Sequence, residues 1–247
     1  EGRLASGRAG AGRLAEPPAI LGALRALIGA THGDLRGRHV VVSAGPTQEP
    51  IDPVRYVGNR SSGKMGFSIA EAARDRGARV TLVAGPVALD TPPGIERRNV
   101  STVDDMLAAL LETTADADAL VMSAAPADFR PENPATQKMK KMPGQESMRI
   151  DLAKNPDILA SLPGGGVRVG FAAETENLAG NAVAKLTSKR LAFIVANDVT
   201  AAGSGFGTDT NQVTMFHDDG RVEELPLLSK YAVAHAILDR VARRFPG

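Results

Sequence analysis

Residues 39–46 read HVVVSAGP and residues 79–86 read RVTLVAGP, so a run of mostly β-branched residues ends twice in the same Ala-Gly-Pro. Short continuous apolar runs of this kind are typical of strands buried on both faces of a parallel sheet. Three further runs follow and also end in small or polar residues; they lie at 119–122, 167–171 and 192–195. The sequence therefore predicts a core of parallel strands.

Helical patterns separate these runs. We expect helices at 67–76, ending at Gly77, at 103–115 after the N-cap candidate Thr102, and at 177–190. Strands that alternate with helices predict an α/β fold with a Rossmann-like, doubly wound, mostly parallel sheet. Runs at 213–216 and 222–225 flank an Asp-Gly turn and predict a C-terminal hairpin, followed by a final helix over 229–244.

The first 37 residues differ from the rest of the chain. Gly2 to Gly12 is rich in Gly, Ala and Arg and is expected to be a loop. Apolar residues of the next stretch fall on one face of a helix; they are Ile20, Leu21, Leu24, Leu27 and Ile28. We interpret 1–37 as the tail of another unit plus a linker, and 38–247 as one domain. Because the chain begins at Glu1, we expect a fragment of a longer protein.

Composition argues against several classes of function. Lys and Arg number 29 and Asp and Glu 28, which leaves no broad electrostatic footprint for nucleic acid or an anionic membrane. The absence of cysteine excludes disulfides, thiolate metal sites and a cysteine nucleophile, and fits a reducing, cytoplasmic compartment. No apolar run approaches the roughly 20 residues that span a membrane, and no signal peptide is visible.

The ends of the five expected strands bear on function. Ligands of open α/β sheets bind beyond the carboxyl ends of the strands, and small residues let a ligand approach the backbone closely. At any one strand, Gly and Ala can simply make the turn. Because all five strands end in this way, we expect a nucleotide-sized crevice at this edge.

Residues 58–65, GNRSSGKM, come close to a Walker A motif. Met65 stands where Ser or Thr would bind Mg²⁺, and the segment lies well beyond its strand, so we reject an ordinary P-loop. Ser61, Ser62 and Gly63 nevertheless open a helix, whose free N–H groups suit a phosphate or carboxylate. Plain helix capping is the alternative.

Two other functions stay open from the residues alone. A nicotinamide-dependent oxidoreductase would share the fold, but the glycine fingerprint is missing after the first strand. Neither Tyr56 nor Tyr231 is followed four residues later by a lysine, as a short-chain dehydrogenase would require. A non-catalytic nucleotide-binding module is the second alternative.

Lysines and two aspartates complete the candidate residues. Residues 128–142 form a long, proline-interrupted loop that carries Lys138, Lys140 and Lys141 and that can close over a triphosphate. A solvated charge run is the alternative. Lys185 and Lys189 lie four residues apart on a predicted helix, a spacing that surface lysines also show. Asp128 and Asp157 are possible neighbours of Mg²⁺.

Taken together, several segments resemble the phosphopantothenate–cysteine ligases. The matching segments are SAGPT (43–47), EPIDPVRY (49–56), NRSSGKMG (59–66), AAPADFR (124–130), KMKK (138–141), KNPDI (154–158), GFAAET (170–175) and AND (196–198). They cover about 38–245 in order. Residues 2–17 resemble the end of the decarboxylase part of the bifunctional bacterial form, whose flavin site and active-site cysteine are missing here.

The resemblance implies a two-step ligase reaction in coenzyme A biosynthesis. CTP activates the carboxylate of 4′-phosphopantothenate as an acyl cytidylate and releases pyrophosphate. The amine of L-cysteine then displaces CMP to form the amide. The implied co-substrate is CTP with Mg²⁺. The implied assembly is a homodimer, with a covalently joined decarboxylase domain in the full-length protein.

The resemblance also implies roles for individual residues. It assigns catalysis to Asn59, which handles the acyl cytidylate, and to Lys138, which contacts the triphosphate. The implied nucleotide-binding residues are Met122, Ser123, Ala124, Asp128, Lys138, Asn155, Pro156, Asp157, Ile158, Phe171, Lys185 and Lys189. We expect Gly45, Asn59, Ser61, Ser62 and Gly63 to bind the substrate or its phosphate, and Asp128 and Asp157 to lie at the metal.

Overall fold

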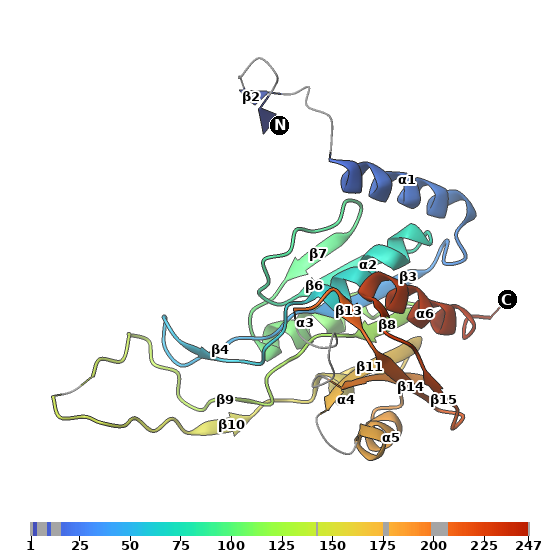
Figure 1. Cartoon of the computed structure of the whole chain (residues 1–247). Helices are drawn as coiled ribbons and strands as arrows, with labels where there is room; N and C mark the ends of the chain where they lie inside the picture. Colours follow the sequence, from blue (N-terminus) through green and yellow to red (C-terminus); the bar gives the residue numbers. More distant parts are fainter. Residues whose placement is uncertain are drawn as a thin grey trace.

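The computed structural model describes residues 2–3, 9–10, 16–141, 143–174, 178–198 and 207–246. An eight-stranded sheet forms its centre, in the order β15-β14-β12-β11-β8-β3-β6-β7 (Figure 1). Six neighbouring strands are parallel: β12 (Phe193–Asp198), β11 (Val167–Glu174), β8 (Ala119–Met122), β3 (His39–Ala44), β6 (Arg79–Ala84) and β7 (Glu96–Asn99). The hairpin of β14 (Val213–His217) and β15 (Val222–Glu224) adds an antiparallel edge. The predicted fold class is confirmed.

Helices cover both faces of the sheet, which explains the continuous apolar runs. Val40 and Val42 of β3 pack in one cluster with α2 (Lys64–Asp75) and α6 (Lys230–Ala242). Val41 points the other way and packs with α3 (Val103–Thr113), α4 (Ile158–Ser161) and α5 (Leu178–Ser188). Successive side chains of a strand face opposite sides, so a strand covered on both sides must be apolar throughout.

Several elements differ from their predicted bounds. α2 begins at Lys64, three residues earlier than expected, after Gly63 in a left-handed conformation. The N-cap of α3 is Thr102, as expected, in a reciprocal capping box with Asp105. β7 was not predicted, because an edge strand made of Glu, Arg, Arg and Asn has no apolar pattern. The predicted helix start at residue 177 lies outside the described residues.

The start of the chain carries a helix that presents its apolar face outward. α1 (Pro17–His32) packs on α2, and a Cβ added to Gly29 would lie 2.3 Å from the carbonyl oxygen of Asp75. The predicted apolar stripe faces solvent, since Leu21, Leu24, Leu27 and Ile28 are 51–65% exposed. The predicted loop over 2–12 was wrong in part, because β1 (Gly2–Arg3) pairs with β2 (Ala9–Gly10).

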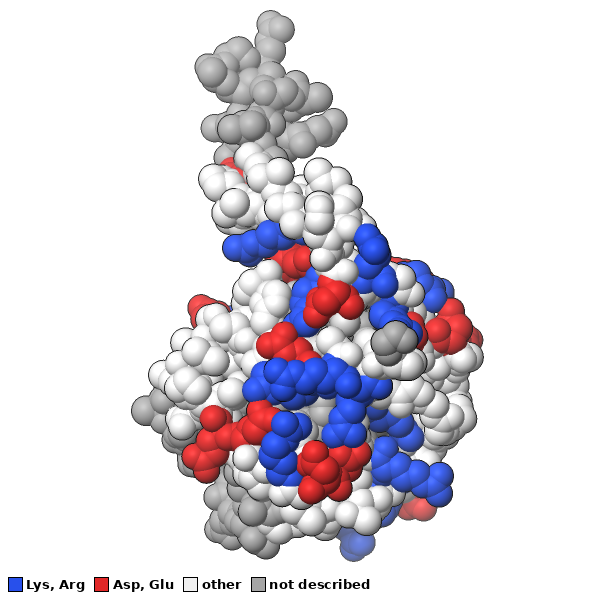
Figure 2. Space-filling model, turned by 90° about the vertical axis from the view of Figure 1, so that its right-hand side faces the viewer, with Lys and Arg blue, Asp and Glu red and all other residues white. Residues whose placement is uncertain are grey.

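Polar contacts tie α1, α2 and α6 together. Arg76 bridges Asp34, just after α1, to Asp239 on α6. The Tyr231 hydroxyl donates to Asp75 at 2.7 Å, and burial, reinforced by Asp75, raises the pKa of Tyr231 to about 12. Figure 2 shows basic and acidic side chains lying next to one another on the face below α1.

Two antiparallel pairs extend from the carboxyl edge of the sheet. β4 (Glu49–Pro50) pairs with β5 (Tyr56–Val57), and β9 (Phe129–Pro131) pairs with β10 (Leu152–Lys154). The lysine loop, residues 132–151, joins β9 to β10, and its described residues, 132–141 and 143–151, project away from the sheet (Figure 1). A further pair, β13 (Thr210–Asn211) and β16 (Leu228–Ser229), leads into α6. In the described ranges no helix is long and apolar enough to cross a membrane.

Acid should destabilise this fold partly through Asp118, which joins the starts of β3 and β8. Its carboxylate accepts from the His39 amide at 2.7 Å and from Arg38 at 3.1 Å, and these bonds hold the pKa of Asp118 below its ordinary value. The unfolded chain therefore takes up the proton first as the pH falls. The stability that Asp118 provides is complete above the unfolded pKa of about 3.9 and is lost as the pH falls through the folded pKa.

We expect Asp118→Asn to flatten the fall in unfolding free energy between roughly pH 5 and pH 2. Urea unfolding over a pH series measures this slope. Asp90→Asn, at an exposed loop position, is the matched control and should keep the wild-type slope. The same slope in all three proteins would contradict the assignment.

Candidate active site

A cavity of about 440 Å³ lies at the carboxyl ends of the parallel strands; we call it the main cavity. The chain runs from β3 to β6 on one side and returns to β8 on the other, so the strand order reverses between β3 and β8. Such a switch point opens a crevice, because the two loops leave in opposite directions. Hydrogen bonds tie the loops at its base, from the Ala125 amide to the Gly45 carbonyl (2.9 Å) and from the Ala124 amide to the Ser43 hydroxyl (3.1 Å).

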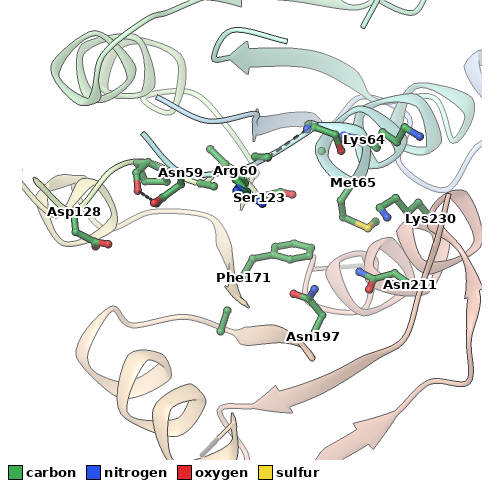
Figure 3. A pocket seen from close by; sticks show the side chains of 18 of the residues that line it. Asn59, Arg60, Lys64, Met65, Ser123, Asp128, Phe171, Asn197, Asn211 and Lys230 are labelled. Carbon is green, nitrogen blue, oxygen red and sulfur yellow. Dashed lines mark hydrogen bonds between the residues drawn. The ribbon is translucent and has the colours of Figure 1, made fainter. Parts of the chain in front are cut away.

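Polar side chains are spread along the main cavity (Figure 3). Asn59 and Asp128 lie toward one end, and Lys64, Asn211 and Lys230 toward the other. Phe171 from β11 and Asn197 from β12 lie between them. Elements that are distant in sequence therefore contribute to one elongated cavity.

The N-terminus of α2 opens into the main cavity through Ser61, Ser62 and Gly63. Gly63 has a φ of 75° and provides no side chain to cap the helix. A Cβ on Gly66 would come within 2.6 Å of the Cβ of Ala44, so the first turn of α2 sits directly on the end of β3. The amides of Gly63 and Lys64 donate to the hydroxyls of Ser61 and Ser62 at 3.3 and 3.5 Å, and the positive end of this helix suits an anionic group.

Positive charge dominates the side chains that line the main cavity. Arg60, Lys64, Lys185 and Lys230 line it, and Asp128 is the single acidic residue among the described lining residues. Lys64 is held by Asp209 at 2.7 Å. Lys230 is buried and donates to the carbonyl oxygens of Thr208 and Thr210; burial, and then the charge of Lys64, lower the pKa of Lys230. An anionic ligand would offset this charge.

The Ser123 hydroxyl is an unsatisfied polar group in this cavity. Its oxygen is buried and has no hydrogen-bond partner within the described part of the chain, and Ser123 is one of the residues that line the main cavity. Buried polar atoms are nearly always paired, so an orphan that faces a cavity indicates a ligand or water as its partner. Ser123 therefore marks where a bound molecule would contact the end of β8.

A smaller side cavity, about 170 Å³, adjoins the main one. The two share Ala124, Pro126, Asp128 and Phe171 as a common wall. Most residues that the resemblance assigned to the nucleotide line the side cavity; they are Met122, Ala124, Asp128, Asn155, Pro156, Asp157, Ile158, Phe171 and Lys189. Ser123 and Lys185 line the main cavity instead.

Some of these side chains also support the loops that form the walls. Asn155 is 5% exposed, donates to the Ala127 carbonyl at 2.9 Å and accepts from Arg130 at 3.3 Å. Asp157 caps α4 through the Ala160 amide and pairs with Lys189 at 3.0 Å. Burial alone would raise the pKa of Asp157, but the bonds from Lys189 and Ala160 lower it.

The described side chains alone do not make a metal centre here. Within the residues that the structure describes, no group of three or more His, Asp or Glu side chains could hold a metal ion. Both carboxylate oxygens of Asp157 have partners in the fold. Mg²⁺ is commonly bound by one or two carboxylates together with substrate phosphates, so the Mg²⁺ assignment to Asp128 and Asp157 stays a prediction.

Two predicted residues lie away from both cavities. Lys138 projects with the lysine loop and lines neither cavity. Gly45 is not a lining residue either. Its φ is 77°, and a Cβ there would lie 2.9 Å from a methyl of Val87. Backbone conformation and close packing therefore explain why glycine stands at this position.

Sequence reasoning missed five polar or charged residues that line the main cavity: Arg60, Lys64, Asn197, Asn211 and Lys230. Arg60, Lys64 and Asn197 stand inside motifs that had been recognised, so their position was a usable signal. Asn211 and Lys230 belong to no motif. Only the pairing of β13 with β16 brings them to the cavity.

Comparisons with known proteins give a consistent family. The chain matches the DNA/pantothenate metabolism flavoprotein C-terminal domain over residues 35–245. It is 47% identical over 247 residues to the coenzyme A biosynthesis bifunctional protein CoaBC of Bacillus subtilis, and 41% identical over 249 residues to that of Escherichia coli strain K12. These alignments cover 98% and 99% of this chain but 60% and 61% of the relatives, so the chain spans about 60% of their length.

Solved structures agree with this result. The chain is 39% identical to the crystallised C-terminal domain of a CoaBC protein, with a TM-score of 0.73 that covers 85% of this chain and 97% of that one. A Cab2 mutant in complex with phosphopantothenate-cysteine is 18% identical, with a TM-score of 0.67 over 93% of this chain and 94% of that one. The second likeness shows the fold alone.

Unfolding should separate the supporting side chains from the exposed ones. Asn155→Ala leaves the Ala127 carbonyl buried without its partner, and we expect a loss of about 1–3 kcal/mol in unfolding free energy. Asn59→Ala removes only an exposed hydrogen bond, from the Asn59 amide to the Pro126 carbonyl at 2.9 Å, and should change this value by less than about 0.5 kcal/mol. Chemical denaturation of both variants tests this difference, and equal losses would refute it.

Proposed function

Because the chain belongs to the family of the DNA/pantothenate metabolism flavoprotein C-terminal domain, we propose that it is a CTP-dependent phosphopantothenate–cysteine ligase of coenzyme A biosynthesis. The family resemblance drawn from the sequence motifs is confirmed. The observation that best supports the activity is the pair of adjoining cavities with a shared wall and an excess of positive charge. Two anionic substrates that must react with each other require such a site.

The chemistry explains why cations are needed. A carboxylate oxygen of 4′-phosphopantothenate attacks the α-phosphorus of CTP, and pyrophosphate leaves with the electron pair of the broken P–O bond. The amine of L-cysteine then attacks the acyl carbon, loses a proton and expels CMP. In the first step a carboxylate approaches a polyphosphate, so fixed positive charge must offset their repulsion. Holding the two substrates in line supplies much of the remaining rate.

We assign the two substrates to the two cavities. The nucleoside of CTP occupies the side cavity, and its phosphates lie at the shared wall of Ala124, Asp128 and Phe171. 4′-Phosphopantothenate lies along the main cavity, with its carboxylate toward Asn59 and its phosphate toward Lys64 and Lys230. Asp128 would hold Mg²⁺ together with the triphosphate, and the ion would offset part of the negative charge of the phosphates. The acyl cytidylate then forms at the junction, within reach of the Asn59 amide.

The position of Lys138 supports a homodimer. The lysine loop leaves its own cavities, so we propose that Lys138 reaches the triphosphate of a second copy. The strands that carry this loop, and the β4–β5 hairpin beside them, expose apolar side chains, as an interface would; they are Val54, Tyr56, Phe129 and Leu152, each 46–60% exposed. The partner copy would thus complete each active site.

Residues 1–37 fit the end of a preceding unit. α1 lies outside the 35–245 match to the C-terminal domain, yet it falls within the alignment with the longer CoaBC relatives. Its apolar stripe, from Leu21 to Ile28, is uncovered by this domain. We propose that the decarboxylase part of a bifunctional protein packs there.

Pyrophosphate release tests the function. We expect release from CTP that depends on 4′-phosphopantothenate and Mg²⁺ and is sustained by L-cysteine. Lys138→Ala should lower the rate by about 10²-fold or more, because it removes a charge that stabilises the transition state. Asn59→Ala should still give an initial burst but not sustain turnover, since it acts on the acyl cytidylate.

The control is Arg149→Ala, at an exposed position on the same loop, which should keep nearly the wild-type rate. Parallel assays with ATP establish the nucleotide preference. If the folded wild-type protein released no pyrophosphate from either nucleotide, the ligase assignment would fail and a nucleotide-binding module would replace it.

Mixed dimers test the shared site. Asn59→Ala and Lys138→Ala chains, each with little or no sustained turnover alone, should regain activity when co-expressed with different tags. About half of randomly paired dimers are mixed and each holds one intact site, so about a quarter of the wild-type rate should return. No recovery in purified mixed dimers would place Lys138 at the site of its own chain.

A further inference from the structure

Asp52 is a buried carboxylate that contacts the lysine loop at Met139. Its side chain is 0% exposed. One oxygen accepts from the amides of Val54 and Arg55 at 2.8 and 2.9 Å. The other accepts from Nε and Nη2 of Arg55 at 3.1 and 2.5 Å, and from the amide of Met139 at 3.1 Å. Five donors therefore converge on one carboxylate.

Three hydrogen bonds connect residues 51–55, the turn between β4 and β5, to the lysine loop. Besides the bond from the Met139 amide to Asp52, Nη2 of Arg55 donates to the Met139 carbonyl at 3.2 Å. The Ala135 amide donates to the Ile51 carbonyl at 2.9 Å. Both backbone groups of Met139 are thus held, and Met139 is the residue next to Lys138. The loop is fixed immediately beside its functional lysine.

The charge of Asp52 suits this task. The Arg55 side chain, with the amides around it, holds the pKa of Asp52 well below its usual range, so the carboxylate stays ionised at physiological pH. A carboxylate only accepts hydrogen bonds, whereas an asparagine at this position would turn an NH₂ group toward donors. The anchor therefore requires the acid and not merely a polar side chain of the same shape.

We propose that Asp52 is a positioning residue of the ligase reaction, which anchors the lysine loop at Met139 and so determines where Lys138 meets the triphosphate. This inference rests on the proposed function. It holds whether Lys138 serves its own chain or a second copy, because the anchor fixes the loop beside Lys138 in either case. A lysine on an unanchored loop would sample many positions, and poorly placed charge stabilises a transition state weakly.

Asp52→Asn tests the anchor in the whole chain. We expect kcat for pyrophosphate release to fall by about 10- to 10²-fold, because Lys138 loses its fixed position. The KM for 4′-phosphopantothenate should stay nearly unchanged, because Asp52 does not line the main cavity. Asp151→Asn is the matched control; this exposed residue lies at the other end of the same loop and should leave both constants unchanged.

Two readouts separate positioning from a merely structural role. If Asp52 acts through Lys138, the double variant Asp52→Asn/Lys138→Ala should be no slower than Lys138→Ala alone. If the fall in kcat of the double variant equalled the product of the two single falls, the proposal would be overturned. Arg55→Lys keeps the positive charge but lacks the planar guanidinium that donates to Asp52 and to the Met139 carbonyl at the same time. Combined with Lys138→Ala, it should likewise be no slower than Lys138→Ala alone. This variant tests the anchor even if Asp52→Asn folds poorly.

Trypsin measures the anchor without the reaction. Cleavage after Lys138, Lys140 and Lys141 should accelerate at least severalfold in Asp52→Asn relative to wild type and to Asp151→Asn, at an unchanged melting temperature. Equal cleavage rates would overturn the proposal. Faster cleavage in a protein that releases no pyrophosphate would instead keep the anchor and reject the proposed function.

Discussion

Burial of the parallel sheet on both faces is the constraint on which this molecule depends. Val40, Val41 and Val42 are fully buried, and helices cover the sheet on either side. The faces of the sheet therefore hold apolar side chains, and the polar residues of the site lie where the strands end. The hydrogen bonds between the loops after β3 and β8 then fix the base of the main cavity. Site and core are consequences of the same arrangement.

The sequence predicted the elements whose signal is local. Strands covered on both faces read as apolar runs, and the Thr102 cap and the hairpin turn carry their own chemistry. β7 was not predicted, because its polar residues show no strand pattern and the strand is defined by its pairing with β6. The orientation of α1 also escaped: periodicity shows that a helix has an apolar face, but the close approach at Gly29 decides which face meets α2. A local sequence pattern does not predict such long-range contacts.

The candidate site divides in the same way. Motif residues such as Asn59 and Asp128 were found from the sequence and line a cavity. Motif membership did not distinguish a ligand contact from a support, since Asn155 holds the backbone of Ala127 and Gly45 serves packing. Lys230 had no local signal, because a distant strand pair brings it to the cavity. Charge at the site thus depends on tertiary structure more than on any single motif.

The two outermost strands of the sheet have a consequence for the molecule in a crowded cell. An open sheet edge offers unpaired backbone groups to any extended chain, and apolar edges promote fibrous aggregation. Here β7 ends the sheet with Glu96, Arg97, Arg98 and Asn99, and β15 ends it with Val222 followed by two glutamates. A further strand that added to either border would have to desolvate these charges. The polar residues that prevented the prediction of β7 therefore also disfavour edge-to-edge aggregation of this protein.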